Sequence, residues 1–219
     1  MRVWWALVKN EFKLYRAQRG LQLAFVLTLA LLAMFRFGLS NEVGVGSALE
    51  VFPVVAYCIA SLQLLLMAID WESEGFAYRY YAMHRVSLSS LFFAKSAVSF
   101  VVQIPLWIFS VIGYFLLFPA TPPDAQTTLL ILLTALPLGL ALAPAGQLIA
   151  AIAQHSAQKN FLAIALFLPL CLPVFIAATG RLGALLAGIE TVRYDALMAA
   201  AALVFIGAGN LLFGYLFEE

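Results

Sequence analysis

The chain has 219 residues, of which 64% are hydrophobic and 11% are charged, and its formal net charge at pH 7 is +1. This composition leaves almost no soluble mass, and it excludes a nucleic-acid-binding module, which needs a basic face on a soluble surface. The two cysteines, Cys58 and Cys171, fall inside apolar runs and form no paired pattern. We therefore predict neither a disulfide framework nor a thiolate metal site.

Six apolar runs dominate the chain, and each is long enough to cross a bilayer as a helix, which takes about 20 residues. The runs lack the short alternating pattern of a membrane β-barrel strand. Because the backbone must satisfy its own hydrogen bonds in hydrocarbon, such runs form helices. We predict an all-α fold, a polytopic membrane bundle that makes residues 1–219 a single transmembrane domain. The predicted spans are residues 21–39, 49–69, 91–118, 127–153, 161–178 and 194–217.

Residues 2–17, before the first span, have the pattern of an interfacial amphipathic helix. Apolar side chains recur at helical spacing on one side: Trp4, Val8, Phe12 and Tyr15. Basic side chains fall on the other side: Arg2, Lys9, Lys13 and Arg16. Glu11 falls near the apolar side, against this pattern. We expect the helix to lie on the membrane, where its basic side chains contact anionic lipid.

Basic residues are distributed unevenly along the chain, and their distribution predicts its orientation. Nine lie before the first span or around the second and fourth loops: Arg2, Lys9, Lys13, Arg16, Arg19, Arg79, Arg85, Lys95 and Lys159. The opposite side carries Arg36, Arg181 and Arg193. Because cytoplasmic loops are enriched in Lys and Arg, the N-terminus, both of these loops and the C-terminus are predicted to be cytoplasmic. We expect Lys95, at the start of the third span, to extend its ammonium back to the interface.

The segment after the second span carries the most varied chemistry of the chain. Asp70, Glu72 and Glu74 are followed by an aromatic and basic stretch. No nucleophile or metal-ligand spacing accompanies these carboxylates, so we predict no catalytic residue and no metal site. We interpret the segment as a docking surface for a partner protein, with the candidates Glu72, Glu74, Gly75, Phe76, Arg79, Tyr80 and Arg85. The shorter loop 154–160 is a predicted secondary contact, through His155 and Lys159.

Prolines inside the spans predict kinked helices, because proline lacks a backbone N–H and clashes with the preceding turn. The predicted kink positions are Pro137, Pro144 and Gly146 in the fourth span and Pro169 and Pro173 in the fifth. Neighbouring helices can satisfy the carbonyl groups that are freed in this way. We expect the fourth span to be an irregular helix that packs closely against a neighbour.

Uncharged polar side chains inside the spans are few: Gln63, Gln103, Gln147 and Asn210. No carboxylate or histidine lies in the middle of a span, and this disfavours an ion-driven transporter, because such proteins carry ionisable relays there. After the fifth span, four apolar residues at one-face helical spacing predict a short amphipathic helix on the outer side: Leu182, Leu185, Leu186 and Ile189.

The order of these features resembles the permease of a type-2 ABC exporter and, more narrowly, the haem exporter protein B family of the cytochrome c maturation system. Three stretches carry the resemblance: Glu72-Ser73-Glu74-Gly75 with Phe92-Phe93-Ala94-Lys95, Leu138-Gly139 with Ala143-Pro144-Ala145-Gly146, and Leu168-Pro169-Leu170-Cys171-Leu172-Pro173. His84 departs from the family, which usually has a proline near the middle of the second loop.

The resemblance implies a non-catalytic membrane subunit of the bacterial cytoplasmic (inner) membrane. ATP hydrolysis would belong to a separate cytoplasmic ABC ATPase, acting as a pair and docking on the loop after the second span. In agreement, the sequence contains no P-loop motif. The other implied partners are a haem-handling membrane protein, a small membrane protein and a periplasmic haem chaperone. Haem would be a cargo for cytochrome c biogenesis, and no cofactor is expected to bind this chain tightly.

Two other functions are compatible with the sequence. One is a type-2 exporter permease for another cargo, such as a lipid, a polysaccharide or a drug. The other is a scaffold protein that holds a membrane complex together without transport. An intramembrane enzyme is disfavoured, because no span presents paired acid, base or nucleophile groups.

Overall fold

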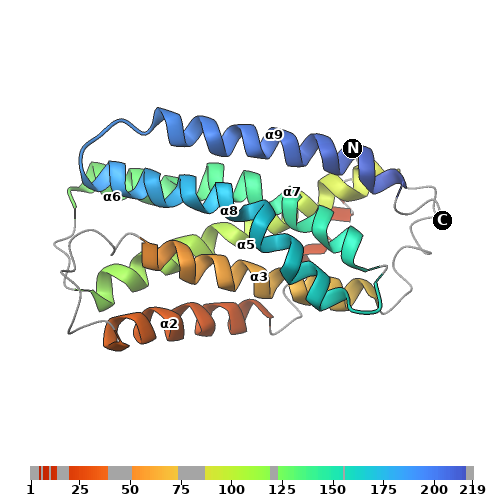
Figure 1. Cartoon of the computed structure of the whole chain (residues 1–219), viewed down its shortest axis with the longest axis horizontal. Helices are drawn as coiled ribbons and strands as arrows, with labels where there is room; N and C mark the ends of the chain where they lie inside the picture. The colour runs from red at the N-terminus through yellow and green to blue at the C-terminus, as the bar shows by residue number, and fades with distance from the viewer. Residues whose placement is uncertain are drawn as a thin grey trace.

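The structure is a computed structural model, and it describes residues 5, 7–9, 11–13, 20–38, 51–73, 87–118, 123–154 and 156–215. Helices make up nearly all of these residues, and no strand occurs among them. The predicted all-α fold is therefore confirmed for the described part of the chain. Figure 1 shows the long helices side by side along the axis of one bundle.

The helices follow one another with these bounds: α2 (Gly20–Gly38), α3 (Val51–Ser73), α5 (Leu88–Leu117), α6 (Ala125–Leu133), α7 (Ala135–Ala153), α8 (Lys159–Leu186) and α9 (Val192–Tyr215). Successive helices run in opposite directions along the bundle, except that α6 and α7 form one broken crossing (Figure 1). We call the end of the bundle where α5 begins the Leu88 end, and the opposite end the Leu117 end.

Among the described residues, five segments are long and apolar enough to cross a membrane: α2, α5, α6 together with α7, α8, and α9. The helix α3 has 23 residues, of which Val51–Leu66 form an apolar stretch, and the sequence stays uncharged as far as Ile69. The structure therefore supports a multi-pass membrane chain. The count of six crossings and the orientation of the chain stay predictions.

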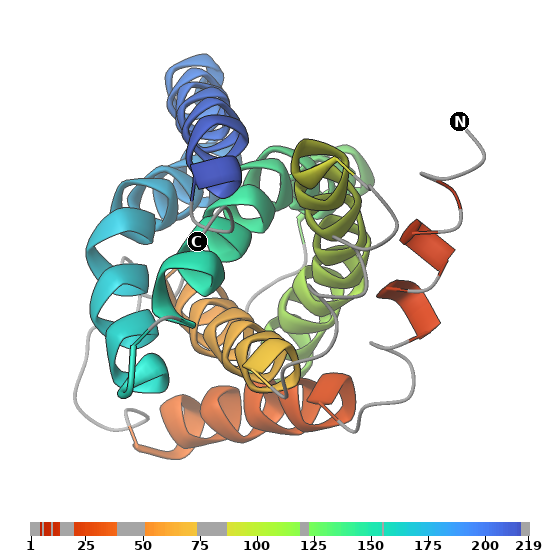
Figure 2. The ribbon, with the colours of Figure 1, turned by 90° about the vertical axis from the view of Figure 1, so that its right-hand side faces the viewer.

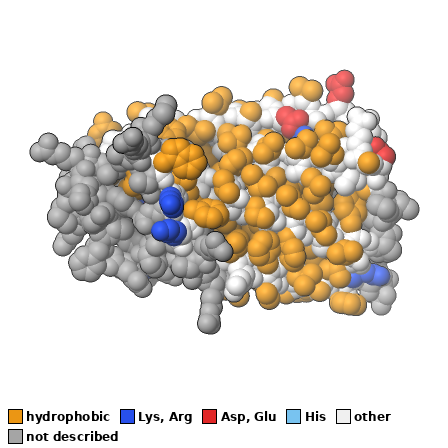
Figure 3. Space-filling view, turned by 180° about the vertical axis from the view of Figure 1, so that it is seen from behind, with side chains coloured by type: hydrophobic (Ala, Val, Ile, Leu, Met, Phe, Trp, Pro, Cys, Tyr) orange, Lys and Arg blue, Asp and Glu red, His pale blue; other side chains and the backbone are white. Residues whose placement is uncertain are grey.

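The outside of the bundle is apolar along most of its length. Large apolar side chains are exposed on several helices, among them Val26 and Met34 of α2, Ile176 of α8 and Leu203 of α9. In Figure 3, hydrophobic side chains cover the middle of the visible face, and charged side chains lie towards its two ends. A soluble monomer rarely exposes so large an apolar surface. Lipid tails supply the surroundings that this surface requires.

The central helix of the bundle is α7, which packs against α3, α5, α8 and α9. Seen from one end, α7 passes between α9 on one side and α3 on the other (Figure 2). Many of its buried side chains are small, including Ala141, Ala145 and Ala150, and small residues let neighbouring backbones approach closely. A Cβ atom at Gly139 would lie 3.0 Å from the ring of Phe100 on α5. The close packing predicted for the fourth span is confirmed.

The fourth span is broken at Thr134, between α6 and α7, rather than at one of its prolines. Pro137 lies in the first turn of α7 and has no N–H to donate to the Leu133 carbonyl. The Thr134 N–H instead donates to the Ile131 carbonyl at 3.1 Å, and its hydroxyl donates to the Leu130 carbonyl at 3.2 Å. The predicted irregularity therefore exists, but it lies at Thr134, three residues before Pro137.

The fifth span is longer than predicted, because α8 runs through Pro169 and Pro173 as far as Leu186. Figure 1 shows that this helix bends along its length, as expected where two prolines each leave a carbonyl of the preceding turn without its helical partner. Leu182 and Leu185 belong to the last turns of α8, so the prediction of a separate short helix is wrong. The helix continues because these turns pack against α6 and α9 and bury Leu182.

The N-terminal segment is helical wherever it is described, but its buried side differs from the predicted one. Leu7 and Glu11 are buried, whereas Phe12 is exposed. Lys95 Nζ of α5 lies 3.4 Å from Glu11 Oε2, and both side chains are 6% exposed. Lys95 is thus paired with Glu11 of the N-terminal segment rather than exposed, and its reach to the membrane interface stays a prediction. The same pair explains why a carboxylate lies on the apolar side of this helix.

Replacing Glu11 by leucine should destabilise the fold, because it leaves the Lys95 ammonium buried without this carboxylate. Removing one partner of a buried ion pair costs about 3–5 kcal/mol, and we expect Glu11→Leu to lower the free energy of unfolding by that amount. The double variant Glu11→Leu/Lys95→Met removes both charges and should recover most of the loss. Denaturant unfolding in detergent, followed by circular dichroism, measures both variants. A Glu11→Leu chain as stable as the unaltered one would contradict the prediction.

Candidate functional site

The predicted docking residues lie mostly outside the described residues, so their geometry stays a prediction. Glu72 belongs to the last turn of α3, and Lys159 is the first residue of α8. Figure 1 places the end of α3 and the starts of α5 and α8 at the Leu88 end. These predicted residues lie outside the described part: Glu74, Gly75, Phe76, Arg79, Tyr80, Arg85 and His155.

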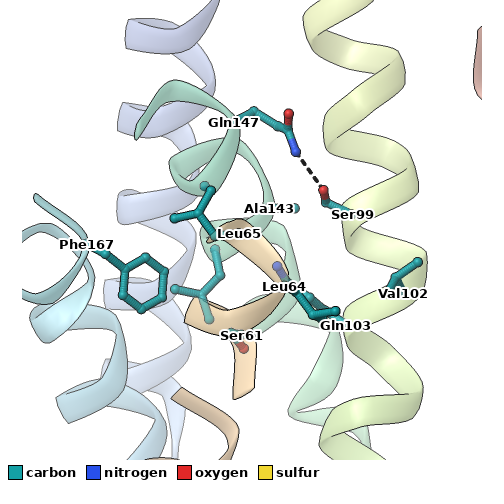
Figure 4. Close-up of a pocket in the computed structure, with 11 residues that line it drawn as sticks. Ser61, Leu64, Leu65, Ser99, Val102, Gln103, Ala143, Gln147 and Phe167 are labelled. Carbon is teal, nitrogen blue, oxygen red and sulfur yellow. Dashed lines mark hydrogen bonds between the residues drawn. The ribbon is translucent and has the colours of Figure 1, made fainter. Parts of the chain in front are cut away.

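Two of the four polar residues predicted inside the spans meet at a small cavity in the bundle. Gln103 of α5 and Gln147 of α7 both line this cavity, together with Ser61 of α3 and Ser99 of α5 (Figure 4). We call these four side chains the polar layer. Gln63 is half-buried elsewhere on α3, and Asn210 is exposed on α9. The rest of the cavity wall is apolar: Leu64, Leu65, Val102, Leu142, Ala143, Gly146 and Phe167.

Hydrogen bonds connect the polar layer across the helices that carry it. Gln147 Nε2 donates to Ser99 Oγ at 2.7 Å, which joins α7 to α5. The Tyr57 hydroxyl donates to Gln103 Oε1 at 3.2 Å, which joins α3 to α5. The Ser61 hydroxyl donates to the Tyr57 carbonyl at 2.7 Å within α3. The polar layer therefore links three helices at the centre of the bundle.

The local sequence explains why these groups converge. Ser99 and Gln103 are four residues apart on α5, so they lie on one face of that helix. Two prolines lie close to the polar layer: Pro105 follows Gln103 on α5, and Pro144 precedes Gln147 on α7. Each proline removes one hydrogen bond of its helix, and this weakens α5 and α7 near the hydrogen bonds that join them.

The cavity is suited to a single water molecule. Its volume is about 20 Å³, and a buried water needs about 10–15 Å³ and two to four polar partners. Pockets that hold organic ligands are much larger, at roughly 300–1,000 Å³. Its wall carries no carboxylate, imidazole or amine, so the lining offers no acid or base for catalysis. In this arrangement the polar layer is a contact between helices with space for one water molecule and no room for a larger molecule.

A second polar cluster, at the Leu117 end, was not found from the sequence. Arg181 of α8 is buried, and its Nε donates to Asp195 Oδ1 of α9 at 2.5 Å. Its Nη1 donates to the Leu130 carbonyl at 3.0 Å and to the Thr134 hydroxyl. The Thr191 hydroxyl donates to Asp195 Oδ2 at 3.0 Å. The only local signal was an arginine at the edge of an apolar run, which we assigned to a loop. The cluster joins the break between α6 and α7 to α8 and α9.

Side chains that could bind a metal or react as thiols are few in the described part of the chain. No group of three or more His, Cys, Asp or Glu side chains is placed there to hold a metal ion. Cys58 of α3 is half-buried and Cys171 of α8 is buried, and both are free cysteines. They contribute to the packing between the helices.

Comparison with known proteins gives no assignment. No model of a known protein family matches the chain, and no curated protein matches it. The function therefore has to be argued from the residues and the geometry.

Replacing Gln147 by methionine should weaken the bundle, because it removes the hydrogen bond to Ser99 while nearly keeping the side-chain volume. Hydrogen bonds between membrane helices contribute about 0.6 kcal/mol on average and at most about 1.7 kcal/mol. We expect Gln147→Met to lower the free energy of unfolding by about 1 kcal/mol. Asn210→Met, which changes an exposed amide on α9, is the matched control and should have no such effect. Equal losses in the two variants would show that the polar layer contributes nothing specific.

Proposed function

We propose that this chain is the permease subunit of an ABC transporter complex of the type-2 exporter kind, and that a separate ATPase drives it. The observation that carries the proposal is a polar layer beside two prolines in the middle of a bundle with an apolar exterior. Polar side chains at such depth are costly, so they mark the part of a membrane protein where function resides. The lack of a P-loop in the sequence supports an ATPase on another chain.

In this proposal α3 also crosses the membrane, which brings the number of crossings to six. The Leu88 end faces the cytoplasm. With 23 residues α3 is about 35 Å long, and the hydrocarbon core is about 30 Å thick. The basic residues of the chain support the orientation. Lys9, Lys13 and Lys159 belong to the Leu88 end, whereas Arg36 and Arg193 belong to the opposite end. Cytoplasmic segments are the ones enriched in Lys and Arg.

The proposed ATPase docks on the segment Glu72–Arg85, with a secondary contact at the loop before Lys159. The segment joins α3 to α5, and both of these helices carry residues of the polar layer. A push on the segment would therefore act on the two helices that Tyr57 and Gln103 connect. ATP binding moves the bundle only if the ATP-bound ATPase favours one helix arrangement over another. We propose that, in the arrangement favoured by the ATP-bound ATPase, the helices that carry the polar layer move apart.

The proposed cargo is haem, delivered to the periplasm of a bacterium for cytochrome c biogenesis. This part of the proposal rests on the resemblance of the sequence to the haem exporter protein B family. The same resemblance implies the haem-handling membrane protein, the small membrane protein and the periplasmic haem chaperone as partners. The cavity of about 20 Å³ has no room for haem in this arrangement. Haem would therefore either follow the outer surface of the bundle or enter after the helices separate.

Charge reversal at the docking segment should release the ATPase. We expect Glu72→Lys/Glu74→Lys to abolish co-purification of the ATPase and its stimulation by the permease, because like charges would face each other at the contact. Glu190→Lys, which reverses an exposed carboxylate near the opposite end, is the matched control and should leave both unchanged. Undiminished co-purification and activity of the double variant would rule out this docking site.

The cargo is tested by the haem content of cytochromes in a bacterial strain that lacks the gene. We expect loss of covalent haem from c-type cytochromes with unchanged b-type haem, and recovery when the gene is returned. Normal c-type haem would rule out haem delivery and leave an exporter for another cargo. Maturation that survives when ATP turnover is blocked in the partner ATPase would instead favour a scaffold protein.

A further inference from the structure

The described part of the N-terminal segment has two different sides. One side faces the bundle and carries Leu7 and Glu11, which are both buried. The other side carries exposed residues one or two helical turns apart: Trp5, Lys9, Phe12 and Lys13. Trp5 is 66% exposed and Phe12 is 46% exposed. An outward surface with two lysines between large aromatic rings is unlike the mostly apolar outside of the long helices.

The buried side connects the ends of three helices. Leu7 belongs to an apolar cluster with Leu91 and Phe92 of α5, Ala151 of α7 and Phe213 of α9. Next to this cluster, Glu11 accepts from the Lys95 ammonium at 3.4 Å. In the end view of Figure 2, the N-terminal segment lies beside α5. Whatever holds the segment in place therefore acts on the Leu88 ends of α5, α7 and α9.

We propose that the outward side of this segment, formed by Trp5, Lys9, Phe12 and Lys13, binds the headgroups of anionic phospholipids. The two ammonium groups are complementary to the lipid phosphates, and each lysine near an anionic surface adds to the binding. The aromatic rings fit the same occupant, since such rings are favoured at headgroup depth. Exposed aromatic rings beside the two lysines favour a lipid headgroup over a free phosphate ion.

Lipid binding and the buried contacts act on the same short helix from opposite sides. A bound headgroup holds the segment against the bundle, and the Glu11–Lys95 pair passes this restraint to α5. Anionic lipid should therefore stabilise the first turns of α5. This inference does not depend on the proposed transport function, because it needs only the membrane and the described contacts.

The test uses the purified full-length chain in vesicles of phosphatidylcholine mixed with phosphatidylglycerol that is brominated on its acyl chains. Bromine quenches nearby tryptophan fluorescence, and the part of the quenching that is lost in a Trp5→Phe variant reports phosphatidylglycerol near Trp5, which is one of four tryptophans in the chain. We expect Lys9→Gln/Lys13→Gln to need roughly thirty times more phosphatidylglycerol for half-maximal quenching, because each lysine contributes about a factor of five. High salt should weaken quenching of the unaltered chain, since it screens exposed charges.

Two further variants make the result decisive. Lys9→Arg/Lys13→Arg keeps both charges and should be quenched like the unaltered chain. Arg193→Gln removes an exposed charge on α9 instead and should also be quenched normally. Equal quenching of the Gln variant and the unaltered chain would overturn the proposal. So would equal quenching by brominated phosphatidylcholine, or a similar weakening in Arg193→Gln.

A second readout tests the link to α5. Hydrogen exchange of amides in the first turns of α5, around Leu91 and Ala94, should slow when phosphatidylglycerol is added to the unaltered chain. The same amides of Lys9→Gln/Lys13→Gln should not respond, while the Arg variant should. Unchanged exchange in the unaltered chain would contradict the coupling, even if the lipid binds.

Discussion

Hydrocarbon offers no hydrogen-bond partners, and the arrangement of this bundle depends on where its few polar side chains find partners inside the protein. Three sets of contacts provide such partners, at three positions along the length of the bundle. Glu11 pairs with Lys95 at the Leu88 end, Gln147 pairs with Ser99 in the middle, and Arg181 pairs with Asp195 at the Leu117 end. The first two pairs join elements that are distant in sequence, and Arg181 adds a third such contact through its bond to Thr134, so together they fix which helices are neighbours.

The central position of α7 follows from the same constraint combined with side-chain size. Lipid tails are as apolar as leucine, so helices in a membrane associate through close packing and interhelical hydrogen bonds. The helix α7 provides both, through its small buried residues and through Gln147. Its prolines have a different effect. Pro137 lies just after the interruption of the span at Thr134, and Pro144 weakens the helix one turn before Gln147. The most tightly packed helix is thus also one whose own hydrogen bonds are interrupted at two prolines.

The sequence predicts the parts of this fold that depend on local patterns. The predicted spans 21–39, 91–118 and 194–217 agree closely with α2, α5 and α9, because a long apolar run is a local signal. Gln103 and Gln147 were found for the same reason, as polar residues inside apolar runs. The docking segment could not be compared, since most of it lies outside the described residues.

The wrong predictions concern contacts between distant residues. Glu11 and Lys95 are 84 positions apart, and Arg181 and Thr134 are 47 apart, so no local periodicity reveals either contact. From the sequence alone, Lys95 is not recognisable as half of a buried ion pair. Arg181 looked like a loop residue for the same reason, and the end of the fifth span was placed too early.

The most direct test of the account asks whether the polar layer is the part of the bundle that opens. A Ser99→Cys variant, with Cys58 and Cys171 replaced by alanine, can be treated with a membrane-impermeant thiol reagent. The account predicts no reaction at rest, where Ser99 is buried, and labelling when the partner ATPase and a non-hydrolysable ATP analogue are present. The same low reactivity with and without the nucleotide-bound ATPase would contradict an opening at this position.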